Sequence, residues 1–350
     1  MLSVLLALGS CKEKTEKASG VNEQSVKAGL NENGDTLTLV ENDSVNTISN
    51  QSVTVNSALN KNEDGSYVFR YNLTKGETYP FLLKIKQDNS VSSQGQSMNI
   101  SSSRMIHFDY FVEEATENKY RLKATFKGFS ESAKGPNGET MAYDTNSVKP
   151  VDKDVAQSWT IYKAITGQSF TMGIDSKGKV LSVNGLEKVV DNTLAKLKND
   201  FTAEEQTQIK ELLSVSLSSE FIKGQFEEML NVFPDKNLKI GEEWSDTQNI
   251  SEGPVKGNVK VTRTLGEIKD GKARITVNGV QDVNGSGTQD GISAVMKNHA
   301  TLNGYMDMDS ETGWIKKVSI TKKETVNNTY QQGGQKQTET GITTTITTVN

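Results

Sequence analysis

The fold is decided by the stretch IHFDYFVEEATENKYRLKATF, residues 106–126. Its large apolar residues stand at alternate positions on either side of a polar run, Glu117-Asn118-Lys119. Successive side chains of a β-strand point to opposite faces, so this alternation predicts two half-buried antiparallel strands joined by a hairpin. The alternating residues are Ile106, Phe108, Tyr110, Val112, Tyr120, Leu122, Ala124 and Phe126.

Similar segments flank this hairpin on both sides. They are the alternating sets Tyr79, Phe81, Leu83, Ile85 and Phe170, Met172, Ile174, the second followed by a turn at 175–178. Residues 342–348 alternate in the same way, and we expect that strand at a sheet edge beside a short N-terminal pair at 36–40 and 53–55. Apolar residues make up only 34% of the 350 residues, which favours short strands and turns over a helical bundle.

Helical spacing of apolar residues appears in the middle of the chain. It predicts a helix near 152–166 and a helical insert over 184–232. Within the insert, Thr202 and Glu205 have the spacing of a capping box. In this motif each of the two side chains accepts a hydrogen bond from the backbone N–H of the other residue.

The strand pattern then resumes and resembles the first half. Residues 75–79 (KGETY) are matched by 240–244 (IGEEW), and the hairpin from Met172 to Val183 by that from Met306 to Val318. We therefore expect an α+β fold, mainly antiparallel β, with two related, strongly curved meander sheets around a central helical insert. The halves would span 29–183 and 233–350, the second as a duplication of the first. Any two antiparallel meanders look alike, which is the alternative explanation.

Cys11, the single cysteine of the chain, follows a short apolar run and the small pair Gly9-Ser10. Leu8-Gly9-Ser10-Cys11 resembles the lipobox of bacterial lipoproteins, whose cysteine is lipidated and becomes the new N-terminus. The run is shorter than the roughly 20 residues that span a membrane. The other interpretation of the apolar run is a buried N-terminal strand. The charged stretch 12–17 argues against it, because those residues could not continue such a strand. We expect a signal peptide over 1–11, lipidation of Cys11 and a flexible tether over 12–28.

Several chemical classes lack the residues they need. The net charge is −5 and the chain has no block of Lys and Arg residues, so we do not expect it to bind nucleic acid, whose phosphates require such cations. His107 and His299 are the only histidines, too few for a zinc site, and no nucleophile motif accompanies them. His107 faces opposite the apolar set of its strand and His299 stands among polar residues, so we expect both to be exposed strand residues. The stretch 282–291 offers oxygen ligands but not the spacing of a calcium loop, so we expect a solvated hairpin loop there. No metal, cofactor or catalytic residue is predicted.

A carboxylate-based glycan hydrolase is one alternative that the composition leaves open. Such enzymes need two acidic residues about 5–10 Å apart. Glu242 and Glu243 beside Trp244 form the most suggestive group, because an aromatic ring can stack on a sugar. Their counterparts in the first half, Glu77 and Tyr79, favour a structural role at the start of a strand instead.

Motifs spread over residues 65–320 resemble a known family. They are LTKGETY (73–79), GQSM (95–98), FTMGIDSKGKV (170–180), FPDK (233–236) and IGEEW (240–244). In this order they are similar to uncharacterised envelope lipoproteins of the Bacteroidetes type, classed as a domain of unknown function. The resemblance implies an outer-membrane-anchored protein of the cell envelope, facing the periplasm or the surface, and assigns no catalytic residue. More loosely, curved sheets covered by helices resemble lipoprotein-carrier domains, which hold lipid in the concavity.

We therefore expect a non-enzymatic lipoprotein, anchored to the membrane by its lipid, that binds a lipid-like ligand or a partner protein in a concave sheet. A structural or docking protein of the envelope without a small ligand is the second alternative. Methionine adapts to irregular apolar shapes. The residues expected to line the concavity are Phe81, Leu83, Phe108, Tyr110, Met172, Met306 and Met308; ordinary core packing is the competing explanation for each.

Overall fold

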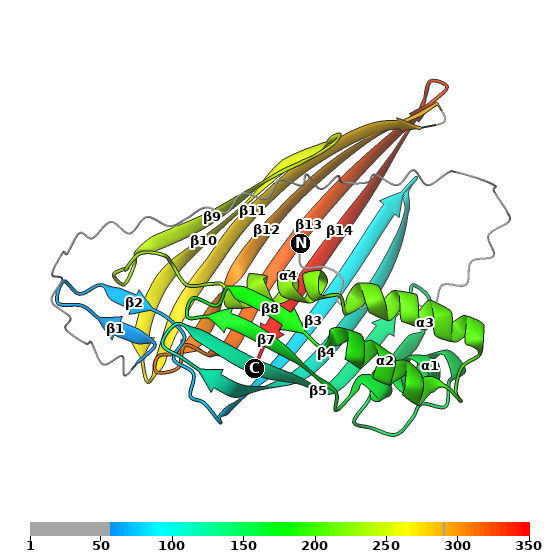
Figure 1. The fold of residues 1–350 in the computed structure, drawn as a ribbon. Helices are drawn as coiled ribbons and strands as arrows, with labels where there is room; N and C mark the ends of the chain where they lie inside the picture. The colour runs from blue at the N-terminus through cyan, green and yellow to red at the C-terminus, as the bar shows by residue number, and fades with distance from the viewer. Residues whose placement is uncertain (1–56, 290) are drawn as a thin grey trace, which may run out of the picture. The chain divides into compact units, whose positions relative to one another are not determined.

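The computed structural model describes residues 57–289 and 291–350 (Figure 1). The expected signal peptide, Cys11, the tether and the two N-terminal strands at 36–40 and 53–55 lie outside these residues. Most of the described chain forms one 12-stranded sheet, and a separate two-stranded sheet pairs β1 (Leu59–Lys61) with β2 (Tyr67–Phe69).

The strands of the large sheet follow the order β8-β7-β5-β4-β3-β14-β13-β12-β11-β10-β9, with β6 beside β5. All pairs in the described residues are antiparallel. The first meander contains β3 (Thr78–Ser93), β4 (Gln96–Ala115), β5 (Lys119–Lys134), β6 (Thr140–Asp144), β7 (Ser169–Asp175) and β8 (Val180–Asn184). The second contains β9 (Glu243–Glu252), β10 (Val255–Lys269), β11 (Lys272–Gln289), β12 (Ile292–Asp309) and β13 (Ile315–Gln332), followed by β14 (Gln335–Val349).

The expected α+β class with mainly antiparallel strands is confirmed. The two meanders, however, are not separate sheets, because β14 pairs with both β13 and β3. The expectation that the C-terminal strand lies at a sheet edge was therefore wrong. Val349 of β14 stands between Val318 and Leu83, and all three are buried. Burial of this apolar row stabilises the junction of the two meanders.

The sheet is curved (Figure 1), and at some of its glycines a side chain would clash with the backbone of the neighbouring strand. A Cβ atom at Gly304 would lie 2.2 Å from the carbonyl oxygen of Ser319, and one at Gly257 would lie 2.2 Å from that of Asp282. Glycine alone fits such a contact, so these positions permit the bend. The segment expected as a loop at 282–291 is also strand as far as Gln289, because its polar residues pair along β10 and β12.

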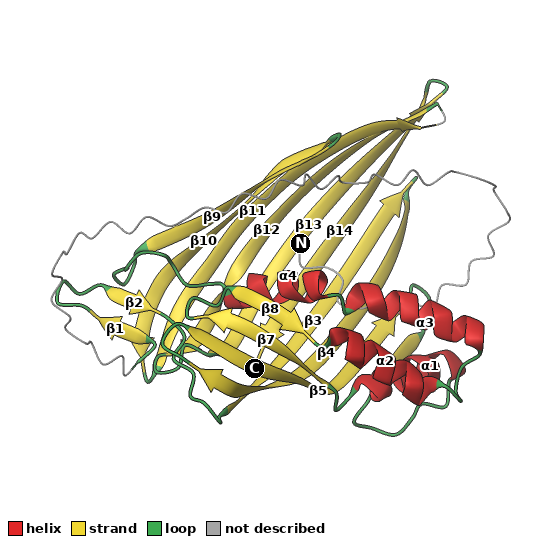
Figure 2. Cartoon of the chain, in the orientation of Figure 1, coloured by secondary structure: helices red, strands yellow, loops and turns green. Residues whose placement is uncertain are grey.

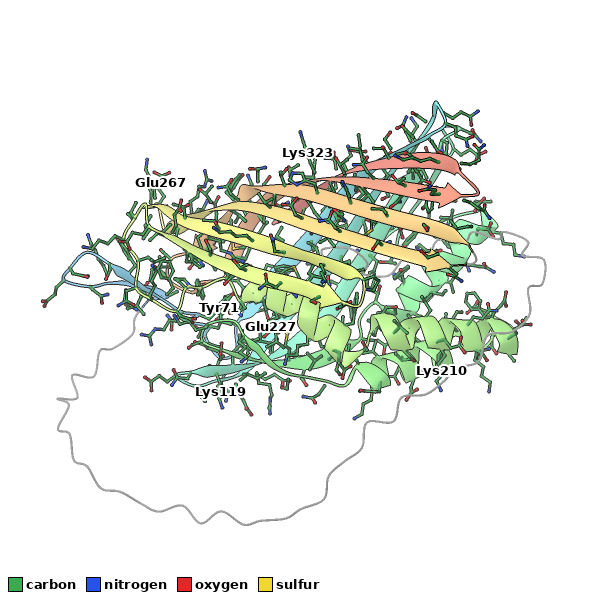
Figure 3. All side chains as sticks on the ribbon, turned by 90° about the horizontal axis from the view of Figure 1, so that it is seen from above. Tyr71, Lys119, Lys210, Glu227, Glu267 and Lys323 are labelled. Carbon is green, nitrogen blue, oxygen red and sulfur yellow. The ribbon has the colours of Figure 1, made fainter. Side chains whose placement is uncertain are left out.

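The described residues form four helices, which lie on one face of the sheet, called the inner face here (Figure 2). They are α1 (Lys153–Ile165), α2 (Leu186–Leu197), α3 (Ala203–Ser216) and α4 (Ser219–Leu230). The capping box of α3 is confirmed, since Thr202 and Glu205 each accept from the other's backbone N–H. The last turn of α4 is bonded by Tyr71, which lies beside that helix (Figure 3); its hydroxyl donates to the carbonyl oxygen of Leu230 at 3.0 Å.

The two meanders share one hydrogen-bond register. The N–H of Gly76 donates to the carbonyl of Val112 at 2.9 Å, and that of Gly241 donates to Leu265 at 2.7 Å. From these points each meander has a row of four residues that are paired across neighbouring strands. The row in the first meander is Val112, Leu122, Met172 and Val183, and the row in the second is Leu265, Ile275, Met306 and Val318. Each inner-face position near the helices therefore has a counterpart in the other meander.

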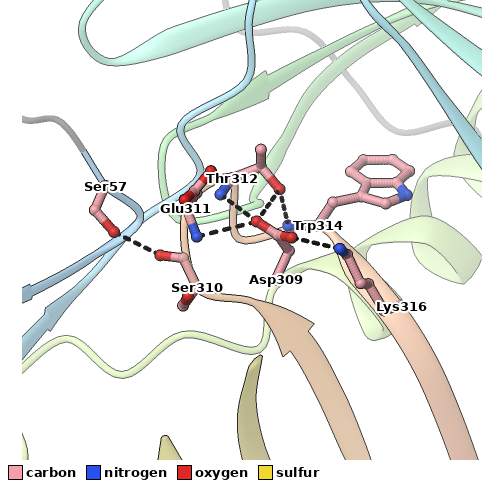
Figure 4. A network of polar contacts seen from close by, with 7 residues as sticks. All are labelled: Ser57, Asp309, Ser310, Glu311, Thr312, Trp314 and Lys316. Carbon is pink, nitrogen blue, oxygen red and sulfur yellow. Dashed lines mark hydrogen bonds and ion pairs between the residues drawn. The ribbon is translucent and has the colours of Figure 1, made fainter. Parts of the chain in front are cut away.

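The turn between β12 and β13 is held by Asp309 (Figure 4). Its carboxylate accepts from the backbone N–H groups of Glu311 and Thr312 at 3.0 and 2.8 Å, and pairs with the Lys316 ammonium at 2.6 Å. The turn places Trp314 in the core, where its ring nitrogen donates to the carbonyl oxygen of Pro80 at 3.2 Å. This indole thereby packs the second meander against the first.

Candidate functional site

An apolar cavity of about 150 Å³ lies on the inner face of the second meander. Met229 of α4 and Val232, just after that helix, form one side of it. Strands β10 to β13 form the floor, with Val261, Val277, Leu302 and Ile320 among the lining residues. An engineered cavity of about this volume, lined by apolar residues alone, stays dry and binds benzene. Most of the residues that line this cavity are apolar as well, so the space suits an apolar group.

The cavity exists because the second meander has small residues where the first has aromatic ones. The first-meander positions Phe108, Phe126 and Phe170 correspond in register to Val261, Gly279 and Gly304. In the first meander these rings contact one another and Phe226 of α4, with centroids 4.9 to 6.4 Å apart. Valine and glycine cannot fill the equivalent volume, and the space remains open.

Two charged residues, Arg263 and Lys322, are among those that line the cavity. Their side chains are only 13% and 14% exposed. Arg263 forms an ion pair with Asp246 of the neighbouring strand β9. The Lys322 ammonium lies 3.2 Å from one carboxylate oxygen of Glu324, and the other oxygen accepts from the Asn298 amide at 2.7 Å. Both cations near the cavity thus have an acidic partner.

Of the seven residues expected to line a concavity, Phe81 and Met306 border this cavity. The others, Leu83, Phe108, Tyr110, Met172 and Met308, are buried in the core with at most 4% of their surface exposed. Burial raises the pKa of the Tyr110 hydroxyl well above its ordinary value, and this hydroxyl has no hydrogen-bond partner among the described residues. All seven lie on the inner face, but most of them fill the first meander's interior.

The residues that form the cavity floor were missed. Val261, Val277, Leu302 and Ile320 alternate with polar residues much as many strand residues do. The one sequence signal was the replacement of Phe126 and Phe170 by Gly279 and Gly304 between otherwise similar segments. Comparing residue volumes at matched positions of the two halves would have located the space.

Other candidate groups occupy structural positions. His107 and His299 lie on the outer face beside carboxylates, 3.6 Å from Asp109 and 2.7 Å from Asp282. Glu242 accepts from the backbone N–H of Lys239 at 2.9 Å, and Glu243 from the Thr264 hydroxyl at 3.2 Å. These contacts hold the start of β9.

Within 57–289 and 291–350, His, Cys, Asp and Glu side chains do not gather in groups of three that could hold a metal ion. In the same part of the chain, no helix is long and apolar enough to cross a membrane.

The model of a protein family described as a family of unknown function, DUF6263, matches residues 117–315, more than half of the chain. A search of curated proteins returned no match.

Solved structures show distant similarity. A structure titled for lipid–protein interactions in lipovitellin is 11% identical, with a TM-score of 0.39 over 80% of this chain, which spans 25% of that one. OccK5 (OpdH) of Pseudomonas aeruginosa is 7% identical, with a TM-score of 0.23 over 79% of this chain and 99% of that one. The beta domain of the Bordetella autotransporter BrkA is 6% identical, with a TM-score of 0.17 over 78% and 98%.

Proposed function

We propose that this chain, which belongs to the family of unknown function DUF6263, binds the apolar chain of a lipid-like ligand on the inner face of its second meander without catalysing a reaction. The observation that carries the proposal is the cavity under α4. It lies where the counterpart positions of the first meander are filled with aromatic rings. A fold that needed only a core at this place could fill it in the same way.

The volume of the cavity fits a single acyl chain. About 150 Å³ admits a benzene-sized group, and so the end of one acyl chain and not two. Each buried methylene contributes about 0.8 kcal/mol, so a half-dozen of them would contribute roughly 5 kcal/mol. That contribution is enough for measurable binding once the rest of the acyl chain lies on the inner face of the sheet.

A matched pair of substitutions on β12 tests this site. Leu302→Trp places an indole in the cavity, whereas Asn303→Trp places it on the outer face, one residue along the same strand. We expect the full chain to bind a pyrene-labelled long-chain alcohol, Leu302→Trp to lose at least tenfold in affinity, and Asn303→Trp to keep wild-type affinity.

Three results would contradict the proposal. If the wild type does not bind the probe, a docking or structural role without a small ligand becomes the better explanation. Equal loss in both variants would place the probe elsewhere. Hydrolysis of a chromogenic glycoside that disappears in Glu243→Gln would contradict the non-enzymatic part.

We also propose that Cys11 carries the lipid that anchors the chain in the outer membrane of a Bacteroidetes-type cell envelope. The lipobox-like segment 8–11 and the charged stretch after it support this address. Two or more acyl chains are needed for stable anchoring, because one binds only marginally. Metabolic labelling with palmitate should mark the wild type and not Cys11→Ser; equal labelling of both would reject the anchor.

A further inference from the structure

We infer that the ligand of this cavity carries an ionised carboxylate, as a fatty acid does, and that this head enters the cavity beside Lys322 of β13 and Thr345 and Thr347 of β14. This inference rests on the proposed function and specifies which end of the acyl chain the cavity takes. All three side chains line the cavity, and they stand on two strands that pair with each other.

The two threonine hydroxyls are buried donors without a partner. Thr345 and Thr347 are 5% and 7% exposed, and neither hydroxyl is hydrogen-bonded within the described residues. Each hydroxyl oxygen nevertheless keeps some accessible surface, and at these positions the open space is the cavity. A buried hydroxyl without a partner is unfavourable, so a ligand that accepts from both removes a cost that the free protein carries.

Lys322 adds a cation to these two donors, because it stands directly opposite Thr345 in the strand pairing. Its side chain is only 14% exposed, and its ammonium lies 3.2 Å from Glu324. That ion pair uses one of three N–H donors, so two remain for a ligand. Glu324 is not among the residues that line the cavity, whereas Lys322 is.

The second cation of the lining is placed in the same way. Arg263 lines the cavity, and its partner Asp246 does not. Among the described residues the lining therefore holds two cations and no acid. Each ion pair is neutral as a whole but presents its positive end to the cavity, and in an apolar enclosure this orientation is little screened.

A carboxylate matches these groups better than other heads do. It only accepts hydrogen bonds, and the ammonium and both hydroxyls can donate to it. A cationic head would lie unpaired beside Lys322 and Arg263, which is strongly unfavourable in a buried place. A doubly charged phosphate would bring more negative charge than an ammonium that already has an acidic partner can balance.

The volume of the cavity agrees with entry by the head end. About 150 Å³ holds a carboxylate and the first methylenes of its chain, which would lie against apolar lining residues such as Leu302 and Ile320. The remaining methylenes would follow the inner face of the sheet.

The first test compares decanoate with decanol, which has the same chain length and no charge. Both displace the pyrene-labelled alcohol from the full chain at pH 8, where decanoate is ionised. We expect Lys322→Met to weaken decanoate at least tenfold and to change decanol and the probe by less than threefold. Unchanged probe binding also shows that the variant folds.

The outcomes separate this inference from the proposed function. If the wild type does not bind the probe, the proposed function fails. If the wild type binds the probe but decanoate does not displace it, or if Lys322→Met weakens decanoate and decanol equally, the cavity binds lipid and this inference is wrong.

A second variant covers the case in which Lys322→Met, which leaves Glu324 unpaired, does not fold. Thr345→Val combined with Thr347→Val removes both hydroxyls and keeps the shape of the side chains. It should weaken decanoate about tenfold and decanol by less than threefold. Thr348→Val, on the outer face of the same strand, is the matched control and should change neither affinity. An unchanged decanoate affinity in the double variant, or an equal loss in Thr348→Val, would overturn the inference.

Decyl phosphate tests the choice between the two anionic heads. We expect it to displace the probe at least threefold less well than decanoate. Displacement as good as that by decanoate, or better, would overturn the assignment of a carboxylate.

Discussion

Met172 and Met306 occupy equivalent positions in the two meanders, and their truncation to alanine should have unequal effects. Met172 is completely buried and stands opposite Leu122, which is also completely buried. Met306 is 6% exposed and borders the cavity. Removing three heavy atoms costs about 2 kcal/mol in transfer free energy at either position.

The difference arises from the space left behind. At Met172 the close-packed neighbours leave a new void, which adds between about 1 and 2 kcal/mol and brings the expected loss to between about 3 and 4 kcal/mol. At Met306 the side chain already borders empty space and has fewer contacts to lose, so we expect a loss of about 2 kcal/mol.

Urea denaturation followed by tryptophan fluorescence measures both losses, because the Trp314 indole lies in the core that joins the meanders. The comparison requires equal denaturant dependence in the two variants, so that midpoints report the free energy of unfolding. Equal losses, or a larger loss for Met306→Ala, would mean that the second meander is as tightly filled as the first. The cavity would then not exist in solution, and the basis of the proposed ligand site would be removed.

Three further predictions concern stability. Gly178→Ala should lower the free energy of unfolding by at least about 3 kcal/mol, because φ is +90° and the new Cβ would lie 2.1 Å from a backbone carbonyl oxygen of α4, which adds overpacking to a left-handed strain of about 1–2 kcal/mol. Gly138→Ala has φ +83° and open space around it, so it should lose only the strain. Equal shifts of the melting temperature in the two variants would contradict this prediction. Thr202→Ala should cost about 1 kcal/mol in urea denaturation through loss of the α3 capping box, and an unchanged midpoint would count against that role. Hydrogen bonds from Arg274 lower the pKa of Asp307 below its ordinary 3.8. These bonds therefore stabilise the fold fully above pH 3.8, and their contribution is lost as the pH falls through the lowered pKa of the folded state. Asp307→Asn should flatten the acid side of the plot of stability against pH, and an unchanged slope would refute this role of Asp307.

The candidate site could be predicted only in part. Alternation identifies which face of a strand is apolar, and it placed Phe81 and Met306 on the inner face, where both border the cavity. It cannot distinguish an apolar residue with neighbours on all sides from one beside a gap, because that depends on the volumes of residues far away in sequence. Phe108 and Met172 are core for this reason, although their pattern matches that of the cavity floor.

Local sequence patterns were enough to predict the antiparallel strands near the helices and the capped start of α3, because these depend on periodicity and on contacts between residues three or four apart. It did not determine how the two meanders join or where the strands end. β14 pairs with β3 across more than 240 residues of chain, and the polar strand ends around residues 282–289 carry little period-2 signal. These features depend on the complete fold, because register, curvature and the cavity result from contacts between side chains that are far apart in sequence.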